Sequence, residues 1–192
     1  MKRARVPALA GAIVLAVLGL SGCNSLTEAQ KGPCPFVKIP TLLAQVTQFG
    51  SGQARDATNV VFQSRIIDVA SACEYSDAKY STVKSTPTGR ETMEVQLKIK
   101  FSTQRGPLAP QGQTVPAKYL VAVTDLRDNI INRGEFPVQL KLGAGGQVLA
   151  TEEEAWMLFK VADKSGSAYR IYTGFVLDQD QLDFNKSLIG GG

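Results

Sequence analysis

Histidine is absent from all 192 residues of this chain. Histidine is the usual proton-transfer group at neutral pH and the commonest metal ligand, so its absence excludes Ser-His-Asp and Cys-His catalysis. Catalysis would have to rely on two carboxylates facing each other across a cleft, as in glycosidase-like hydrolases. The sequence singles out no such pair. We therefore expect a protein that is not an enzyme and that holds no cofactor and no metal.

Net charge is also nearly absent once the first residues are set aside. The formal charge is +4, but Lys2, Arg3 and Arg5 lie in a segment that we expect to be cleaved. Residues 23–192 carry 18 Lys and Arg against 17 Asp and Glu. A nearly neutral chain lacks the basic surface that nucleic acids require, so we expect no nucleic-acid partner.

A long hydrophobic run is missing too, although a short one occupies residues 6–20. Together with its basic start and small-residue exit, it has the three parts of a signal peptide. As a helix, its roughly fifteen residues would span only about 22 Å, whereas a bilayer's hydrocarbon core is about 30 Å thick. A permanent transmembrane helix is therefore disfavoured. One alternative is an ordinary cleaved signal with an incidental cysteine.

The exit of this segment reads Leu20-Ser21-Gly22-Cys23 and resembles the lipobox of bacterial lipoproteins. That resemblance implies removal of residues 1–22 and attachment of acyl chains at Cys23. Two or more such chains bind a membrane stably. Asn24 follows where Asp often marks inner-membrane retention, so the resemblance favours the outer membrane, facing the periplasm. The remaining chain resembles uncharacterised proteobacterial envelope lipoproteins, which supply no site residue.

Only three cysteines are present, and lipidation would use one of them. Cys34 and Cys73 remain as an even pair in an oxidising compartment, which predicts a disulfide. Closing its loop of about 40 residues would stabilise the fold by roughly 4 kcal/mol on the chain-entropy argument. A hairpin about residues 48–59 that sets Cys34 opposite Cys73 is consistent with this pairing. Two free thiols are the alternative, and a redox-active pair is disfavoured because no C-x-x-C motif is present.

Alternating hydrophobicity predicts strands. The clearest pattern places five apolar residues in alternation with polar ones between positions 93 and 101. Further strands are expected at 35–46 (interrupted by Pro40), 60–75, 117–126, 130–142, 152–161 and 168–177. The last two are apolar on both faces and are expected to be central. We predict a mainly β fold, an antiparallel β-sandwich of about seven strands, immunoglobulin-like or fibronectin-III-like, with a short C-terminal helix.

The expected domain organisation follows from these segments. Residues 1–22 form the signal peptide, 23–33 a tether, 34–189 the sandwich domain and 190–192 a flexible tail. Ten flexible tether residues have a reach of about 17 Å, which would keep the domain close to the bilayer. Asp178 and Gln181 form a capping box for a helix that extends to about Lys186.

Two acidic clusters and one pair of lysines could form binding sites, but we interpret each of them as a structural feature. Asp178, Asp180 and Asp183 lack the spacing of a calcium loop, so helix capping is the better account. The run at residues 152–154, three glutamates, is expected to be solvated charge at a strand entrance. Lys98 and Lys100 are interpreted as a solvated face of a sheet, with a binding patch as the alternative.

Two further features are interpreted in the same way. Glycines within residues 143–146 are expected to form a flexible turn, because no helix pattern follows them as a phosphate loop requires. Aromatic side chains of the last two strands would stack a ligand or fill the core, and their expected central position favours the core. These aromatic residues are Trp156, Phe159, Tyr169, Tyr172 and Phe175.

Two functions remain open from the sequence. In the first, a membrane-anchored, non-catalytic β-sandwich binds another envelope protein, and exposed edge strands suit such a partner. In the alternative, the lipoprotein binds a small molecule or lipid in a pocket between the sheets. A contiguous apolar cavity would support the second function, whereas a tightly packed core would count against it.

Overall fold

A computed structural model describes residues 33–52, 54–76, 92–109, 114–145, 147–161 and 165–190. All of these residues belong to one compact unit, Lys31–Gly192. The predicted signal peptide, the lipid attachment at Cys23, nearly all of the tether and residues 191–192 lie outside the described residues. The predictions about them remain predictions.

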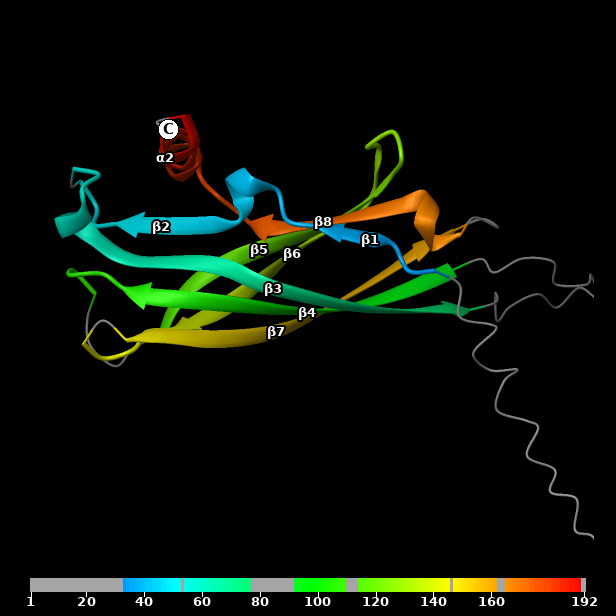
Figure 1. Cartoon of the computed structure of the whole chain (residues 1–192), viewed down its shortest axis with the longest axis horizontal. Coiled ribbons are helices and arrows are strands. Elements are labelled where there is room, and N and C mark those ends of the chain that lie inside the picture. The colour runs from blue at the N-terminus through cyan, green and yellow to red at the C-terminus, as the bar shows by residue number, and fades with distance from the viewer. Residues whose placement is uncertain are drawn as a thin grey trace, which may run out of the picture. The chain divides into compact units, whose positions relative to one another are not determined.

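Two four-stranded sheets and one helix make up the described chain (Figure 1). The elements are β1 (Phe36–Lys38), β2 (Gln45–Phe49), β3 (Val60–Ser76), β4 (Thr92–Arg105), β5 (Thr114–Asp125), β6 (Ile130–Lys141), β7 (Val148–Lys160), β8 (Tyr169–Phe175) and α2 (Gln179–Gly190). One sheet has the order β1-β8-β5-β6, and the other β2-β3-β4-β7. All pairs are antiparallel except β1 with β8. The predicted mainly β sandwich with a C-terminal helix is confirmed.

The core is built on the inner face of β4. Its alternating apolar residues are all completely buried, as the pattern predicted: Met93, Val95, Leu97, Ile99 and Phe101. The Phe101 ring lies 5.5 Å from that of Tyr119 and 5.4 Å from that of Phe175, both on the opposite sheet. Ring contacts of this kind contribute beyond the area they bury. They hold the two layers together at the centre of the sandwich.

The first predicted strand is in fact two strands in different sheets. β1 pairs with β8, whereas β2 pairs with β3. Pro40 lies between them, followed by a 3₁₀ turn at Thr41–Leu43. Proline has no N–H to donate to a sheet ladder, so the chain leaves one sheet here and enters the other. The turn packs tightly on β8, because a Cβ at Gly174 would lie 2.5 Å from that of Leu43.

Cys34 and Cys73 form the predicted disulfide, but the predicted hairpin is not its cause. The pairing of β2 with β3 ends where Gln45 lies opposite Arg65, so the hairpin does not extend to the cysteines. Cys34 instead lies two residues before β1, which belongs to the other sheet. The disulfide therefore joins the edge of one sheet to a strand of the other.

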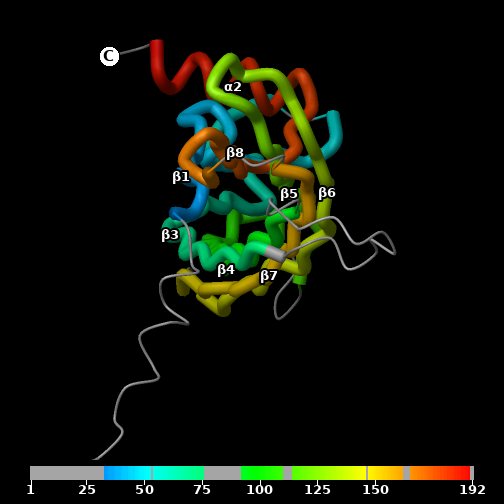
Figure 2. Tube along the Cα trace, turned by 90° about the vertical axis from the view of Figure 1, so that its right-hand side faces the viewer, coloured from blue at the N-terminus to red at the C-terminus, as the bar shows by residue number. Residues whose placement is uncertain are grey.

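On the opposite side of the sandwich, β6 and β7 lie side by side (Figure 2). Asn132 Nδ2 donates to the Leu158 carbonyl at 2.9 Å, and the Lys141 N–H donates to Thr151 Oγ1 at 3.3 Å. β7 was predicted to be central but is the outer strand of its sheet, whereas β8 is central as predicted. Side-chain bonds rather than a backbone ladder link the sheets on this side.

Substituting both cysteines with serine (Cys34→Ser with Cys73→Ser) is expected to lower the free energy of unfolding by about 4 kcal/mol. The two residues are 39 positions apart, and opening that loop restores entropy to the unfolded chain. Urea denaturation followed by circular dichroism measures the change. Reduction of the wild-type chain serves as the control and should lower its stability to that of the variant. An unchanged denaturation midpoint would contradict the expectation.

Candidate functional site

The outer face of the β2-β3-β4-β7 sheet carries cross-strand ion pairs over part of its length. Lys98 Nζ lies 3.3 Å from Glu154, and Lys100 Nζ lies 3.2 Å from Glu152. These side chains are largely exposed, so the pairs contribute little to stability. The lysines lie on the exposed face as predicted, and their contacts are with neighbouring carboxylates.

Glu153 differs from the glutamates on either side of it. It pairs in register with Ile99, whose side chain is completely buried, so Glu153 is on the inner face of β7 and is only partly exposed. The prediction of three solvated glutamates is wrong at this position, since a strand turns alternate side chains to opposite faces. Burial, and secondarily the charge of Glu153, raises the pKa of Tyr119 to about 12.

Beside the ion pairs, two large apolar side chains of β7 are exposed. Trp156 is 54% exposed and Leu158 58%, which corrects the prediction that Trp156 lies in the core. Trp156 and Leu158 are on the outer face of an edge strand, where no element of the described chain forms a covering layer. Across the sheet, Trp156 is in line with Gln96 and the exposed Ala72. We call Trp156 and Leu158 the Trp156 patch. The other predicted core aromatics Phe159, Tyr169 and Phe175 are buried, and Tyr172 is partly buried.

Two carboxylates border the Trp156 patch. Glu74 of β3 lies directly opposite Glu94 of β4, and Glu94 lies opposite Leu158. Like charges directly opposite each other destabilise a sheet. Within the part of the chain that the structure describes, neither carboxylate forms an ion pair. Exposed apolar surface thus lies beside negative charge that no ion pair of the described residues neutralises.

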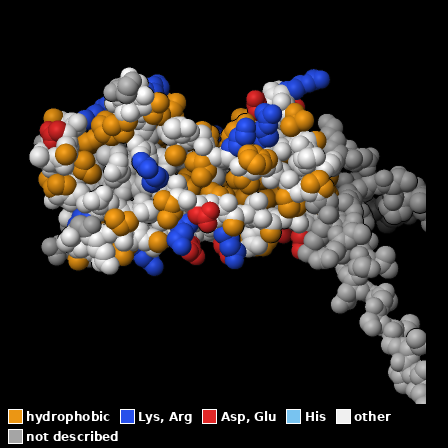
Figure 3. Space-filling view, in the orientation of Figure 1, with side chains coloured by type: hydrophobic (Ala, Val, Ile, Leu, Met, Phe, Trp, Pro, Cys, Tyr) orange, Lys and Arg blue, Asp and Glu red, His pale blue; other side chains and the backbone are white. Residues whose placement is uncertain are grey.

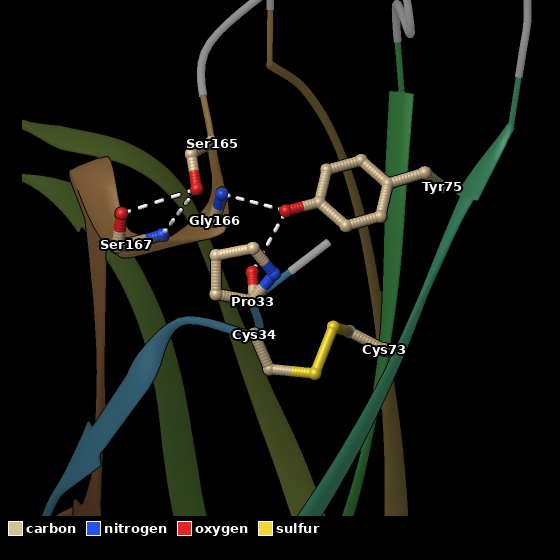
Figure 4. The surroundings of a disulfide bond; sticks show 7 residues. All are labelled: Pro33, Cys34, Cys73, Tyr75, Ser165, Gly166 and Ser167. Carbon is tan, nitrogen blue, oxygen red and sulfur yellow. Dashed lines mark hydrogen bonds between the residues drawn. A yellow bond between two sulfur atoms is a disulfide. The ribbon is translucent and has the colours of Figure 1, made fainter. Parts of the chain in front are cut away.

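The same end of the sandwich holds the point where the chain enters the domain (Figure 4). Tyr75 Oη donates to the Pro33 carbonyl and accepts from the Gly166 N–H, each at 2.7 Å. A Cβ at Gly166 would lie 2.1 Å from the Pro33 carbonyl oxygen, so the close approach requires glycine. Cys73 aligns across the sheet with Val95 and Met157, which places the Trp156 patch at this end.

The capping box of α2 is present as predicted. The Gln181 N–H donates to Asp178 Oδ1 at 2.7 Å, and the Asp178 N–H donates to Gln181 Oε1 at 3.1 Å. The helix continues to Gly190, beyond the predicted end near Lys186 and into the predicted tail.

The three aspartates near this helix have separate roles. Asp180 pairs with Arg55 at 2.7 Å, while Asp183 accepts from Gln179 and Lys186. These hydrogen bonds, the one from Gln179 foremost, hold the pKa of Asp183 below its usual range. Among the described residues, no group of three or more His, Cys, Asp or Glu side chains is placed to hold a metal ion.

α2 is held against β2 by one buried side chain. Asn185 is 2% exposed, and its Nδ2 donates to the carbonyls of Leu42 and Gln45, both at 2.9 Å. A groove of about 410 Å³ beside this contact is bordered by Leu188 and Ile189. Between the sheets, Phe101, Tyr119 and Phe175 fill the centre of the core, so that region gives no support to a ligand pocket there.

Comparisons with known proteins identify no relative. No protein family matches the chain, and neither a curated protein nor a solved structure does. Among the described residues, no helix has the length and apolar character needed to cross a membrane.

Asn185→Ala is expected to lower the free energy of unfolding by about 1–3 kcal/mol, because two carbonyls lose their buried donor. Hydrogen exchange should increase across α2. The neighbouring Lys186→Ala is the matched control, because it removes only an exposed ion pair and should cost about 0.5 kcal/mol or less. Equal effects of the two substitutions would show that Asn185 does not hold the helix.

Proposed function

We propose that this protein is a lipoprotein anchored through Cys23, at the periplasmic face of the bacterial outer membrane, and that its β-sandwich binds another envelope protein without catalysis. The observation that carries the binding role is the Trp156 patch. Trp156 and Leu158 are more than half exposed beside each other on one strand face. Exposed apolar surface of this kind is typical of sites where proteins interact.

The composition of the patch favours a protein partner. Tryptophan is enriched among the residues that contribute most to binding, because its large ring buries much apolar surface. Glu74 and Glu94 favour basic side chains on the partner, since opposite charges across an interface steer and orient association. The same two charges disfavour contact with an anionic lipid surface.

The position of the patch suits an anchored protein. It lies at the end of the sandwich where Pro33 and Cys34 enter the domain. A tether of about ten residues between Cys23 and this point has a reach of about 17 Å. The patch would then meet partners that are themselves held at the membrane.

The anchor is tested by Cys23→Ser, with residues 1–22 replaced by a cleavable signal that lacks a lipobox. This replacement prevents an uncleaved signal from acting as a second anchor. We expect the variant in the soluble periplasmic fraction, while the wild-type chain sediments with membranes and incorporates labelled palmitate. An unmodified Cys23 thiol in the wild-type chain, shown by mass spectrometry, would refute the lipid anchor.

The partner surface is tested by a photo-crosslinking amino acid placed at Leu158 in the native envelope. We expect a discrete adduct that falls at least tenfold when Trp156→Ala is added, because truncation of a tryptophan that is a binding hot spot costs about 2 kcal/mol or more. The matched controls are the same crosslinker at Ile130, which is 65% exposed on the other sheet, and Phe36→Ala in place of Trp156→Ala. Adducts of equal yield from both crosslinker positions would exclude the patch as the binding surface.

A further inference from the structure

The outer edge of β3 is paired over only part of its length. Pairing with β2 ends where Gln45 lies opposite Arg65, and the Ile66 N–H then donates to the Ala44 carbonyl at 2.9 Å. On its other side, β3 stays paired with β4 as far as Ser76. Among the described strands, none pairs with β3 beyond this point on the β2 side. A regular strand therefore has a free edge.

This edge is suited in length and regularity to accept another strand. A bulge at Ile67 marks the end of β2, and from Asp68 to Ala72 the register with β4 is continuous. In such a strand, every second residue directs its N–H and C=O groups away from the neighbouring strand. Free groups of this kind are a template for strand addition, and five to six residues are an ordinary strand length.

The inward side chains along this edge are also incompletely covered. Ser71 lies opposite the completely buried Leu97 and is therefore on the inner face, yet it is exposed. Val69, two residues earlier on the same face, is only partly buried. Figure 3 shows hydrophobic side chains gathered on this side of the molecule, between β1 and β3. An added strand would cover these positions with its own inward side chains.

The outward side chains along this edge determine which charge an added strand should carry. The outward residues of β3 here are Asp68, Ala70, Ala72 and Glu74, so both charges are negative. Lys100 lies opposite Asp68, but its ion pair is with Glu152. A second copy of this chain would bring its own acidic edge against this one, which like-charge repulsion disfavours.

We infer that residues 67–72 of β3 bind an extended segment of a partner protein as an added strand, in which inward β-branched residues alternate with outward Lys or Arg. Main-chain hydrogen bonds supply the affinity, and the alternate side chains supply the specificity. The inference rests on the proposed function only in that the partner is a protein. The edge lies on the opposite border of the sheet from the Trp156 patch.

The probe is a nine-residue peptide of alternating Lys and Val, capped at both ends, added to the mature full-length chain in nanodiscs. Fluorescence anisotropy measures its affinity, and hydrogen exchange locates its site. Two further peptides carry N-methyl groups on all Val or on all Lys. Since alternate N–H groups of a strand point to opposite edges, one methylated peptide should bind at least tenfold more weakly, and the other within about threefold of the parent.

We expect the parent peptide to protect residues 67–72 from hydrogen exchange. The variant Asp68→Lys should no longer bind this peptide and should instead bind a peptide of alternating Glu and Val. Strand addition would be overturned if N-methylation of Val and N-methylation of Lys changed the peptide affinity equally. It would also be overturned if the parent peptide protected a different part of the chain from exchange. Glu135→Lys, which reverses an exposed charge on the other sheet, is the matched control and should change affinity by less than about threefold. Trp156→Ala should leave the affinity for the peptide unchanged. Loss of the adduct at Leu158 therefore tests the Trp156 patch, and loss of peptide binding tests the edge of β3.

Discussion

Burial of the inner face of β4 is the constraint on which the rest of this structure depends. A strand whose alternate residues are all apolar is stable in water only if another layer covers that face. The second sheet supplies the layer, and Phe101 reaches across to Tyr119 and Phe175 within it. Because both layers are sheets with finite width, the sandwich has two open sides. How each side is closed determines which surfaces remain free.

The two sides are closed by different means. Side-chain hydrogen bonds link β6 with β7 on one side. On the other side, the chain crosses between sheets after Pro40, and the disulfide joins Cys34 to β3. Neither device supplies a strand next to residues 67–72. The free edge is therefore a consequence of a short β2 beside a long β3.

Two surfaces of one sheet follow from this arrangement, and each is the basis of a proposal of protein recognition. On the β7 border, Trp156 and Leu158 are exposed, and in the described part of the chain their acidic neighbours Glu74 and Glu94 form no ion pair. On the β3 border, main-chain groups of residues 67–72 have no neighbouring strand among those that the structure describes. The disulfide and Tyr75 hold the start of the domain at the end of the sandwich where the Trp156 patch lies.

Local patterns were sufficient for much of this protein. Alternation identified β4 and its core residues, the capping residues located the start of α2, and cysteine count paired Cys34 with Cys73. Tertiary structure alone decided which sheet each strand joins, and with it the inter-sheet role of the disulfide, the exposure of Trp156, the inward face of Glu153 and the free edge of β3. The reason is that period-two hydrophobicity specifies the two faces of a strand but not its neighbours. Those neighbours are selected by pairing between residues far apart in the chain.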